Sequence, residues 1–422
     1  GAKLRLKRGR LGLLLAASAV ESKGDFEYID RFGRRRVRIN AGAERRAGLA
    51  KLTFKPKPGI ELLLSIDGRL SHNGDPGMMG FPQPNAFVED RSGSLRCELK
   101  LGRTSISING RKARLRYYNP DSKYRVDDLH RLTSAGIELR ALDFIKLSLR
   151  RDVIRSTTIG RRGRDSLGLS IFRSVERGRL TLFGALRLDG SSDFGPAFSP
   201  AVGLSWDLGR LILRGSWRRS FRAPTFNDLY WPEDAFAKGN PDLRPEKGSS
   251  IEAGVILRAE RLRASLELFR SRIDDMIQWA PGRGGKWMPQ NIATARISGA
   301  EIDLRSKPLR FISLRLSYAF MRAVDGEGYP LLYRPRHSFT YGLKLERGRL
   351  WLEMAGRAEG KRYFRRGAFL KPYHVHNLRL GISGRVDLIL AVENILDERY
   401  LLVEGYPLPG RRWRVKISGD LF

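Results

Sequence analysis

The sequence has few of the residues that build disulfide-stabilised or metal-dependent proteins. It has 422 residues but only one cysteine, Cys97, and five histidines. A single cysteine excludes an intrachain disulfide framework and a multi-cysteine metal site. His374 and His376 alone lie close together, and their i, i+2 spacing places both on one face of a strand. No cysteine or carboxylate partner is evident near them, so polar lining is favoured, and metal binding by this pair stays open.

Long apolar runs are also missing. A transmembrane helix needs roughly 20 apolar residues in succession, and no stretch of the chain approaches that. The nearest candidate, LGLLLAASAV at 11–20, follows a basic segment and resembles the core of a signal peptide, but strand-like sequence continues after it without a break. We therefore predict a strand there.

The sequence shows no pattern typical of an enzyme. Serine, histidine and aspartate are scattered without the spacing of a nucleophile elbow or a metalloprotease motif. We accordingly expect no catalytic residues, no cofactor and no metal site.

Basic residues strongly outnumber acidic ones. The chain carries 79 Lys and Arg against 45 Asp and Glu, a formal net charge of +34. Such an excess is typical of proteins that bind nucleic acid or an anionic membrane surface. The basic residues are spread along the chain in alternation with apolar ones, without a basic tail or zinc-finger spacing. We expect no nucleic-acid partner, and a soluble polyanion-binding β-protein is disfavoured.

The dominant sequence period is two. In 310–320, one face carries Ile312, Leu314 and Leu316, whereas Ser313, Arg315 and Ser317 alternate with them. The same pattern recurs at 179–188 and 261–270. Alternation of this kind indicates strands, and we find no convincing apolar run at helical spacing. The fold class predicted from the sequence is all-β.

Connections alternate between short and long. Short ones include 176–179 and 346–349, and long ones include 220–249 and 273–296. Regular alternation with strands of about 10 residues predicts a transmembrane antiparallel β-barrel, with short periplasmic turns and long extracellular loops. The pattern yields 21 strands in a single domain, 1–422. Single-chain bacterial barrels have an even number, so we expect about 22 strands in the intact barrel, with one more upstream.

Several motifs occur in a fixed order. SFRAPTFNDLYWP at 220–232 is followed by GNPDLRPEKG at 239–248, then by NIATARISGAEID at 291–303 and VENILDERY at 392–400. Together with GDFEY at 24–28, this set resembles the barrel of TonB-dependent outer-membrane receptors. The early loop motifs are more similar to the cobalamin and siderophore receptor branches than to the glycan branch.

The resemblance implies a function and a set of partners. It implies a multi-pass barrel in the bacterial outer membrane that imports a scarce nutrient, such as a ferric siderophore or cobalamin, with energy from a TonB-type protein. Implied partners are outer-membrane lipid and lipopolysaccharide, and the family's N-terminal plug domain, for which 1–20 has no room. A small-molecule nutrient, such as an anionic iron chelate, is also implied. Two alternatives stay open: a plugless passive pore, and one chain of a split receptor.

Candidate site residues follow from the motifs and from the predicted loops. Loop aromatics able to stack on a flat ligand, or else to pack in the loops or the interfacial girdle, are Phe26, Tyr28, Trp231, Phe236, Trp279, Trp287 and Tyr406. Positions of the family signature, with structural roles expected, are Arg222, Pro224, Asn240, Pro241, Pro245, Glu246, Gly299, Glu301, Asn394, Asp397 and the terminal Phe422. Arginines in 214–222 and 113–118 are expected to face the lumen, either to attract anions or to pair with neighbouring acidic groups.

Overall fold

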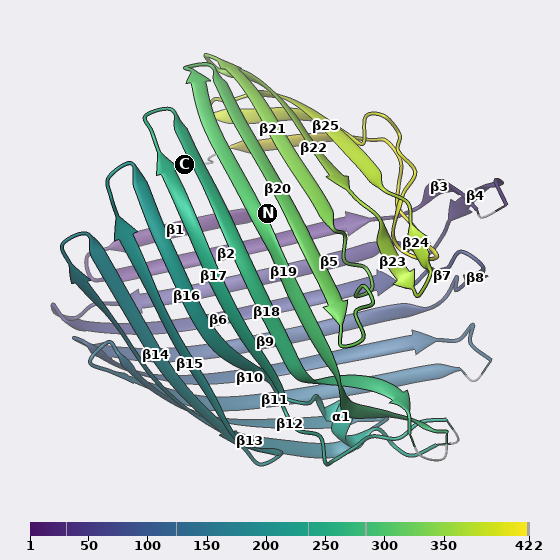
Figure 1. The fold of residues 1–422 in the computed structure, drawn as a ribbon, viewed down its shortest axis with the longest axis horizontal. Coiled ribbons are helices and arrows are strands. Elements are labelled where there is room, and N and C mark those ends of the chain that lie inside the picture. Colours follow the sequence, from purple (N-terminus) through teal and green to yellow (C-terminus); the bar gives the residue numbers. More distant parts are fainter. Residues whose placement is uncertain (31, 124, 235, 283–284, 420–422) are drawn as a thin grey trace.

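The fold is one large antiparallel sheet of 21 strands that curves into a barrel wall (Figure 1). The computed structural model describes residues 1–30, 32–123, 125–234, 236–282 and 285–419. The wall strands are β1 (Ala2–Arg8), β2 (Leu11–Ser22), β5 (Ala43–Phe54), β6 (Ile60–Gly74), β9 (Phe87–Leu101), β10 (Thr104–Asn119), β11 (Val126–Ala141), β12 (Ile145–Ser156), β13 (Gly160–Arg177), β14 (Leu180–Ser191), β15 (Phe194–Asp207), β16 (Leu211–Arg222), β17 (Glu246–Arg258), β18 (Leu262–Pro281), β19 (Trp287–Leu309), β20 (Ile312–Asp325), β21 (His337–Arg347), β22 (Leu350–Glu359), β25 (Tyr373–Ile382), β26 (Val386–Glu393) and β29 (Arg412–Gly419).

Each wall strand pairs antiparallel with the next wall strand along the chain, from β1–β2 to β26–β29. The predicted all-β antiparallel barrel and its 21 strands are thus confirmed. The segment 11–20 lies within β2, as expected.

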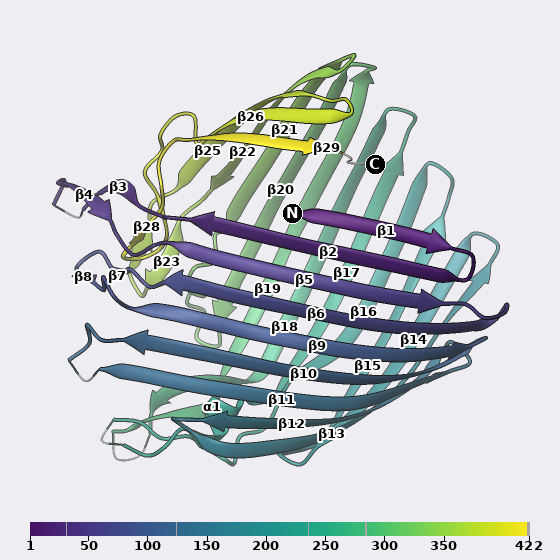
Figure 2. The ribbon, with the colours of Figure 1, turned by 180° about the vertical axis from the view of Figure 1, so that it is seen from behind.

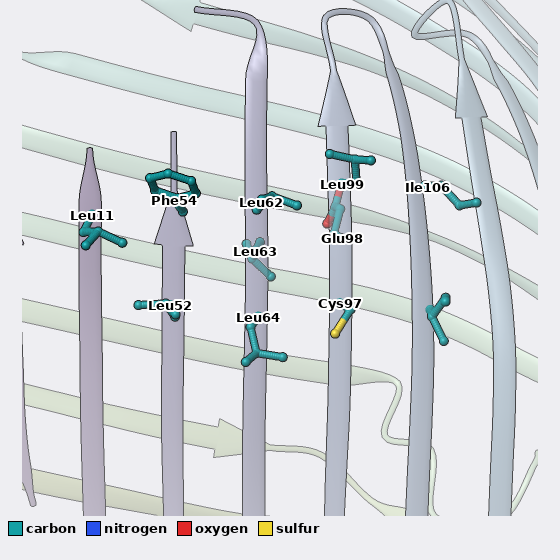
Figure 3. A pocket seen from close by; sticks show the side chains of 11 residues that line it. Leu11, Leu52, Phe54, Leu62, Leu63, Leu64, Cys97, Glu98, Leu99 and Ile106 are labelled. Carbon is teal, nitrogen blue, oxygen red and sulfur yellow. The ribbon is translucent and has the colours of Figure 1, made fainter. Parts of the chain in front are cut away.

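One face of the wall carries a continuous apolar band because the register aligns the apolar positions of successive strands. Leu62 lies opposite Leu99, which lies opposite Ile106, and Leu64 is joined in the same way to Cys97 and Ile108. Side chains of this parity form an apolar hollow of about 690 Å³ across β2, β5, β6, β9 and β10 (Figure 3). In a membrane barrel this is the lipid-facing side, so the hollow is a stretch of outer wall.

The opposite face is polar and rich in ion pairs. Arg218 binds Glu252 at 2.6 Å and Lys146 binds Glu138 at 2.7 Å, with both partners on the inner face. Of the arginines in 214–222, three face the lumen and pair with acidic groups on neighbouring strands, namely Arg214, Arg218 and Arg222. Arg219 shares the parity of Leu213 and Trp217 and faces outward, so the expectation was wrong for it. The expectation for 113–118 was wrong, because Arg114 and Arg116 share the parity of Ile106 and Ile108 and face outward.

The sheet has two free edges. Since every neighbour is antiparallel, the first and the twenty-first strand, β1 and β29, run in the same direction (Figure 2). Among the described residues, no pairing joins these two edges. A hollow of about 1040 Å³ lies along this seam, with Gly1, Ala2 and Gly419 among its lining residues.

The loop end of the barrel carries small elements that the sequence did not predict. They are β3 (Phe26–Ile29), β4 (Arg35–Arg38), β7 (Gly77–Met78), β8 (Phe81–Pro82), α1 (Phe226–Tyr230), β23 (Arg362–Arg365), β24 (Ala368–Leu370), β27 (Leu401–Val403) and β28 (Tyr406–Pro407). Some predicted long loops are shorter than expected, because β18 and β19 extend into 273–296 and leave only 282–286 between them. Within the described part of the chain, no helix is long and apolar enough to cross a membrane.

The single cysteine provides a test of which face meets lipid. A nitroxide label on Cys97 is expected to collide more often with dissolved oxygen than with a water-soluble nickel chelate, because Cys97 shares the apolar face with Leu64 and Ile108. The matched control places the label one residue along, with Glu98→Cys in a Cys97→Ser background. That label should show the reverse preference, since Glu98 lies on the ion-paired inner face. Equal preferences at the two positions would contradict the assignment of faces.

Candidate ligand-binding mouth

The long loops meet one another at one end of the barrel (Figure 1). The N–H of Met79 donates to the carbonyl of Gly405 at 2.9 Å, and the N–H of Tyr333 donates to the carbonyl of Tyr363 at 2.7 Å. Arg399 Nη1 donates to the carbonyl of Glu27 at 2.9 Å across the seam. Loops distant in sequence are therefore joined into one layer, in which a ligand-binding surface can be held.

Helix α1 anchors the loop between β16 and β17. Thr225 and Asp228 form a capping box, in which the Asp228 N–H donates to Thr225 Oγ1 at 3.1 Å and the Thr225 N–H donates to Asp228 Oδ2 at 3.0 Å. The 220–232 motif was not expected to be helical, and the spacing of Thr225 and Asp228 is the signal that could have revealed this turn.

Two predicted aromatics pack on this helix. Trp279 Nε1 donates to Asp228 Oδ1 at 3.2 Å, and its ring meets Trp231 edge-on with 6.3 Å between centroids. Both rings are half-buried, and Leu229 beside them is fully buried. These contacts hold the loop against the β18–β19 hairpin, so the structure gives both tryptophans a packing role.

The returning segment 239–248 is fixed by polar contacts. Asn240 Nδ2 donates to the Pro289 carbonyl at 3.0 Å, and the Asn240 N–H donates to the Asp228 carbonyl at 2.8 Å. Pro224, on the outgoing side of the loop, is fully buried, whereas Pro241 is exposed and Pro245 half-buried. The motif thus ties the loop to α1 and to β19 at the same time.

Glu246 closes the base of this loop. Its two carboxylate oxygens accept a bidentate pair of hydrogen bonds from Arg222, with Nε–Oε2 at 2.7 Å, and the Ile277 N–H donates to Oε1 at 2.7 Å. Arg244, two residues before Glu246, pairs with Asp275 at 3.0 Å and not with Glu246. Three chain segments therefore meet at one buried carboxylate.

Phe236 and Trp287 are the two most exposed of the seven candidate aromatics. Phe236 is 78% exposed and Trp287 is 51% exposed. They lie next to each other, since the Trp287 N–H donates to the Phe236 carbonyl at 2.7 Å. An exposed aromatic pair on an ordered backbone is suited to stacking on a flat ligand.

A second group of residues surrounds Arg38, which sequence reasoning missed. Arg38 is 4% exposed, donates to the Gly77 carbonyl, and lies 5.7 Å from the ring centroid of Tyr406. Burial lowers its pKa. The contacts of Arg38 with Gly77 and Tyr406 join loop 23–42 to loops 75–86 and 394–411. Tyr28 in the first of these loops is buried, whereas the Tyr406 side chain is accessible. Arg38 belongs to the basic run 34–38, which gave no signal that one of its members is buried.

Phe26, on β3, lies in a separate polar hollow of about 550 Å³ together with Asp397, Arg399 and Arg411. This hollow is at the loop end of the seam, where β2 extends beyond the start of β1. It therefore belongs to the open edge as much as to the mouth.

The other signature residues have distinct positions. A Cβ atom on Gly299 would lie 2.7 Å from Phe269 Cζ, so only glycine fits beneath that ring. Asn394 Nδ2 donates to the Glu398 carbonyl at 2.9 Å, and Asp397 Oδ1 accepts the Arg411 N–H at 2.7 Å, a bond that lowers the pKa of Asp397. Glu301 is exposed on β19. Phe422 lies outside the described residues.

His374 and His376 lie on the outward face of β25. His376 Nδ1 is 2.5 Å from the Tyr341 hydroxyl, and the two imidazole centroids are 5.4 Å apart. Among the described residues, no group of three or more His, Cys, Asp or Glu side chains could hold a metal ion. The two histidines extend an aromatic band with Tyr341 and Phe339 at the border of the apolar face.

The family described as "TonB dependent receptor-like, beta-barrel" matches residues 24–395. The chain belongs to this family. Its members are receptors and transporters of the bacterial outer membrane, which agrees with the predicted class and argues at the family level against an enzyme.

Sequence relatives include the "Vitamin B12 transporter BtuB" of Vibrio vulnificus (strain YJ016), which is 27% identical over 293 residues, or 66% of this chain and 46% of the relative. The protein of the same name from Photobacterium profundum is 26% identical over 54% of this chain and 39% of its own length. The chain thus spans less than half the length of these relatives.

Solved structures share the fold. The "Copper transporter OprC" has a TM-score of 0.80 at 16% identity, with 98% of this chain and 77% of that chain covered. The siderophore receptor PirA from Acinetobacter baumannii has a TM-score of 0.78 at 14% identity, with 98% and 76% covered. At these identities the likeness concerns the fold alone.

The contacts of Glu246 yield a testable prediction. Glu246→Gln should weaken the charge-assisted pair with Arg222 and loosen loop 223–245, at a cost of about 1–3 kcal/mol. Limited trypsin digestion of the folded barrel is expected to cut after Lys238 tenfold faster or more. Glu301→Gln is the control, because Glu301 is exposed and has no ion pair in the described part of the chain. Unchanged cleavage in Glu246→Gln would show that the pair does not hold the loop.

Proposed function

We propose that this chain forms the barrel of a TonB-energised outer-membrane receptor whose nutrient is a corrinoid of the cobalamin class. The choice of class is supported by the sequence relatives, which are vitamin B12 transporters. A ferric siderophore is the second candidate, supported by the siderophore receptors that share the fold.

The observation that carries the proposal is the accessible pair of Phe236 and Trp287 on the anchored loop layer. The main chain of this pair is fixed by the Trp287–Phe236 hydrogen bond and by the Lys238 N–H, which donates to the Trp287 carbonyl at 2.9 Å. Ordering two large aromatics before binding reduces the entropy lost on association. A macrocycle with a broad apolar face fits such a surface better than a small hydrated ion does.

Removal of the exposed rings should weaken binding. The double substitution Phe236→Ala and Trp287→Ala is expected to raise the dissociation constant for cyanocobalamin roughly tenfold or more, as loss of two stacking rings implies. Equilibrium binding to the receptor isolated from its native membrane measures this. Phe81→Ala is the matched control, since Phe81 is also 78% exposed but lies on β8. Equal effects of the two variants would reject this pair as the contact surface, and binding of a ferric siderophore alone would favour the second candidate.

We also infer how the barrel closes. The parallel directions of β1 and β29 require one further strand, antiparallel to both, if every edge inside the membrane is to be paired. The hollow along the seam lies where that strand would pass. Membership of the TonB-dependent receptor family, and not the strand directions, supports a plug domain through which a TonB-type protein would act.

The alternatives differ in the size of the intact protein. The receptor proposal predicts a mass for the protein isolated from its outer membrane that exceeds 47.9 kDa by the mass of a domain of roughly 100–150 residues. Intact-mass spectrometry measures it. A mass equal to 47.9 kDa would reject the single-chain receptor. Large steady conductance in a planar bilayer would then indicate a passive pore, and co-purification of a second, plug-sized chain would indicate a split receptor.

A further inference from the structure

Both free edges of the sheet carry cations on the lumenal face. In β1 the outward positions Leu4 and Leu6 alternate with basic residues that face the lumen. In β29 the outward positions Val415 and Ile417 alternate with basic residues in the same way. These six edge cations are Lys3, Arg5, Lys7, Arg412, Arg414 and Lys416. The seam between β1 and β29 (Figure 2) is therefore bordered by cations inside the barrel and by apolar side chains outside it.

The neighbouring strands neutralise few of the edge cations. Strand β2 offers no carboxylate to β1, because the residues directly opposite its three cations are Gly12, Leu14 and Ala16. On the other side of the seam, Glu393 binds Arg412 at 2.8 Å and Arg414 at 3.2 Å. In the part of the chain that the structure describes, the side chains without an ion pair or hydrogen bond are those of Lys3, Arg5, Lys7 and Lys416. Six cations thus share one acidic side chain.

At other places in the wall, a lumenal cation takes its partner from the adjacent strand. Arg379 on β25 lies directly opposite Glu353 on β22 and binds it at 3.5 Å. Lys146 on β12 binds Glu138 on β11 at 2.7 Å. Opposite charges on one face of neighbouring strands stabilise a sheet, whereas like charges destabilise it. A strand that fills the seam is the adjacent strand that the edge cations require.

The hollow of about 1040 Å³ along the seam lies beside the edge cations. Its lining includes Lys3 and Arg5 from one edge and Gly419 from the other, so the two edges approach each other at this level. In an antiparallel pair, directly opposed residues project to the same face of the sheet. The residues that oppose the cations of β1 would therefore face the lumen, and those that oppose its leucines would face lipid.

We propose that the strand which fills the seam alternates acidic residues, facing the lumen, with apolar residues, facing lipid, and that it belongs to the same polypeptide. The proposal rests on the barrel closure inferred above and adds the chemistry of the closing strand. Its carboxylates would bind the edge cations through charge-assisted hydrogen bonds, and its apolar side chains would continue the lipid-facing band across the seam. A second copy of this chain fits the seam poorly, because its own edges would oppose cation to cation.

Carbodiimide coupling of the protein isolated from its outer membrane tests the chemistry of the strand, because the reagent joins a lysine amine to a carboxylate in direct contact. Tandem mass spectrometry of the peptides is expected to show Lys3 or Lys7 joined to an acidic segment outside residues 1–422. The contact of Lys146 with Glu138 is the internal positive control. A photoreactive residue at an outward position, Leu6→benzoylphenylalanine, captures the neighbouring strand whatever its charge.

The two captures separate the chemistry of the strand from its existence. A captured strand with neutral or basic residues opposite the cations of β1 would overturn the acidic strand and leave the closure intact. Capture of no segment by either reagent would reject the closure as well. Capture of a separate polypeptide would overturn the assignment of the strand to the same chain.

Removal of the cations of β1 should weaken the closed barrel. The combination of Lys3→Gln, Arg5→Gln and Lys7→Gln is expected to unfold on heating roughly tenfold faster than the wild type, since three carboxylates lose their partners. The shift in gel mobility that accompanies barrel unfolding measures the rate. The matched control removes the same charge from lumenal positions of β5, β6 and β10, with Lys51→Gln, Arg69→Gln and Arg111→Gln. Equal rates in the two variants would contradict the proposal.

A charge exchange covers the case in which the triple variant does not assemble. Arg5→Glu alone should prevent assembly or speed unfolding, because it sets two carboxylates against each other. Reversal of the opposing acid to arginine in the same protein should restore the wild-type rate. Failure of the second substitution to restore it would show that the two side chains do not pair.

Discussion

The pairing of every backbone N–H and C=O inside the membrane is the constraint on which the rest of this structure depends. Hydrocarbon offers no partner for a free edge, so strands must join a sheet that closes. The wall obeys this along its length, with each strand paired to the next. The two edges that end the sheet, β1 and β29, run in the same direction, so they cannot join each other as antiparallel neighbours.

A paired wall gives each strand two faces, and the charge of the protein divides between them. On the inner face, acids and bases from adjacent strands form pairs such as Arg218–Glu252, so the lumen is less positive than the net charge of +34 suggests. On the outer face, cations near the loop end have few acidic neighbours. Part of the excess charge therefore lies on the outer face near the loop end, at residues such as Arg114, Arg131 and Arg155.

The mouth is held by a small number of buried polar groups. Glu246 joins β16, β17 and β18, and Asp228 joins α1 to Trp279 and Asn240. Arg38 plays the corresponding role among the loops between β2 and β9. These groups fix the main chain so that Phe236 and Trp287 can remain exposed on an ordered layer. Rigidity and accessibility are thus supplied by different residues.

The sequence by itself determined the two-residue period, the strand order and the family, because alternation and turn position are local properties of the chain. It also determined the odd strand number, from which the open seam follows. Only the tertiary structure decided which arginines face lipid: Arg114 and Arg116 were assigned to the lumen until the register joined them to Ile106 and Ile108. The burial of Arg38 and the turn of α1 were likewise decided by contacts between distant loops, since their energies come from partners that no short stretch of sequence contains.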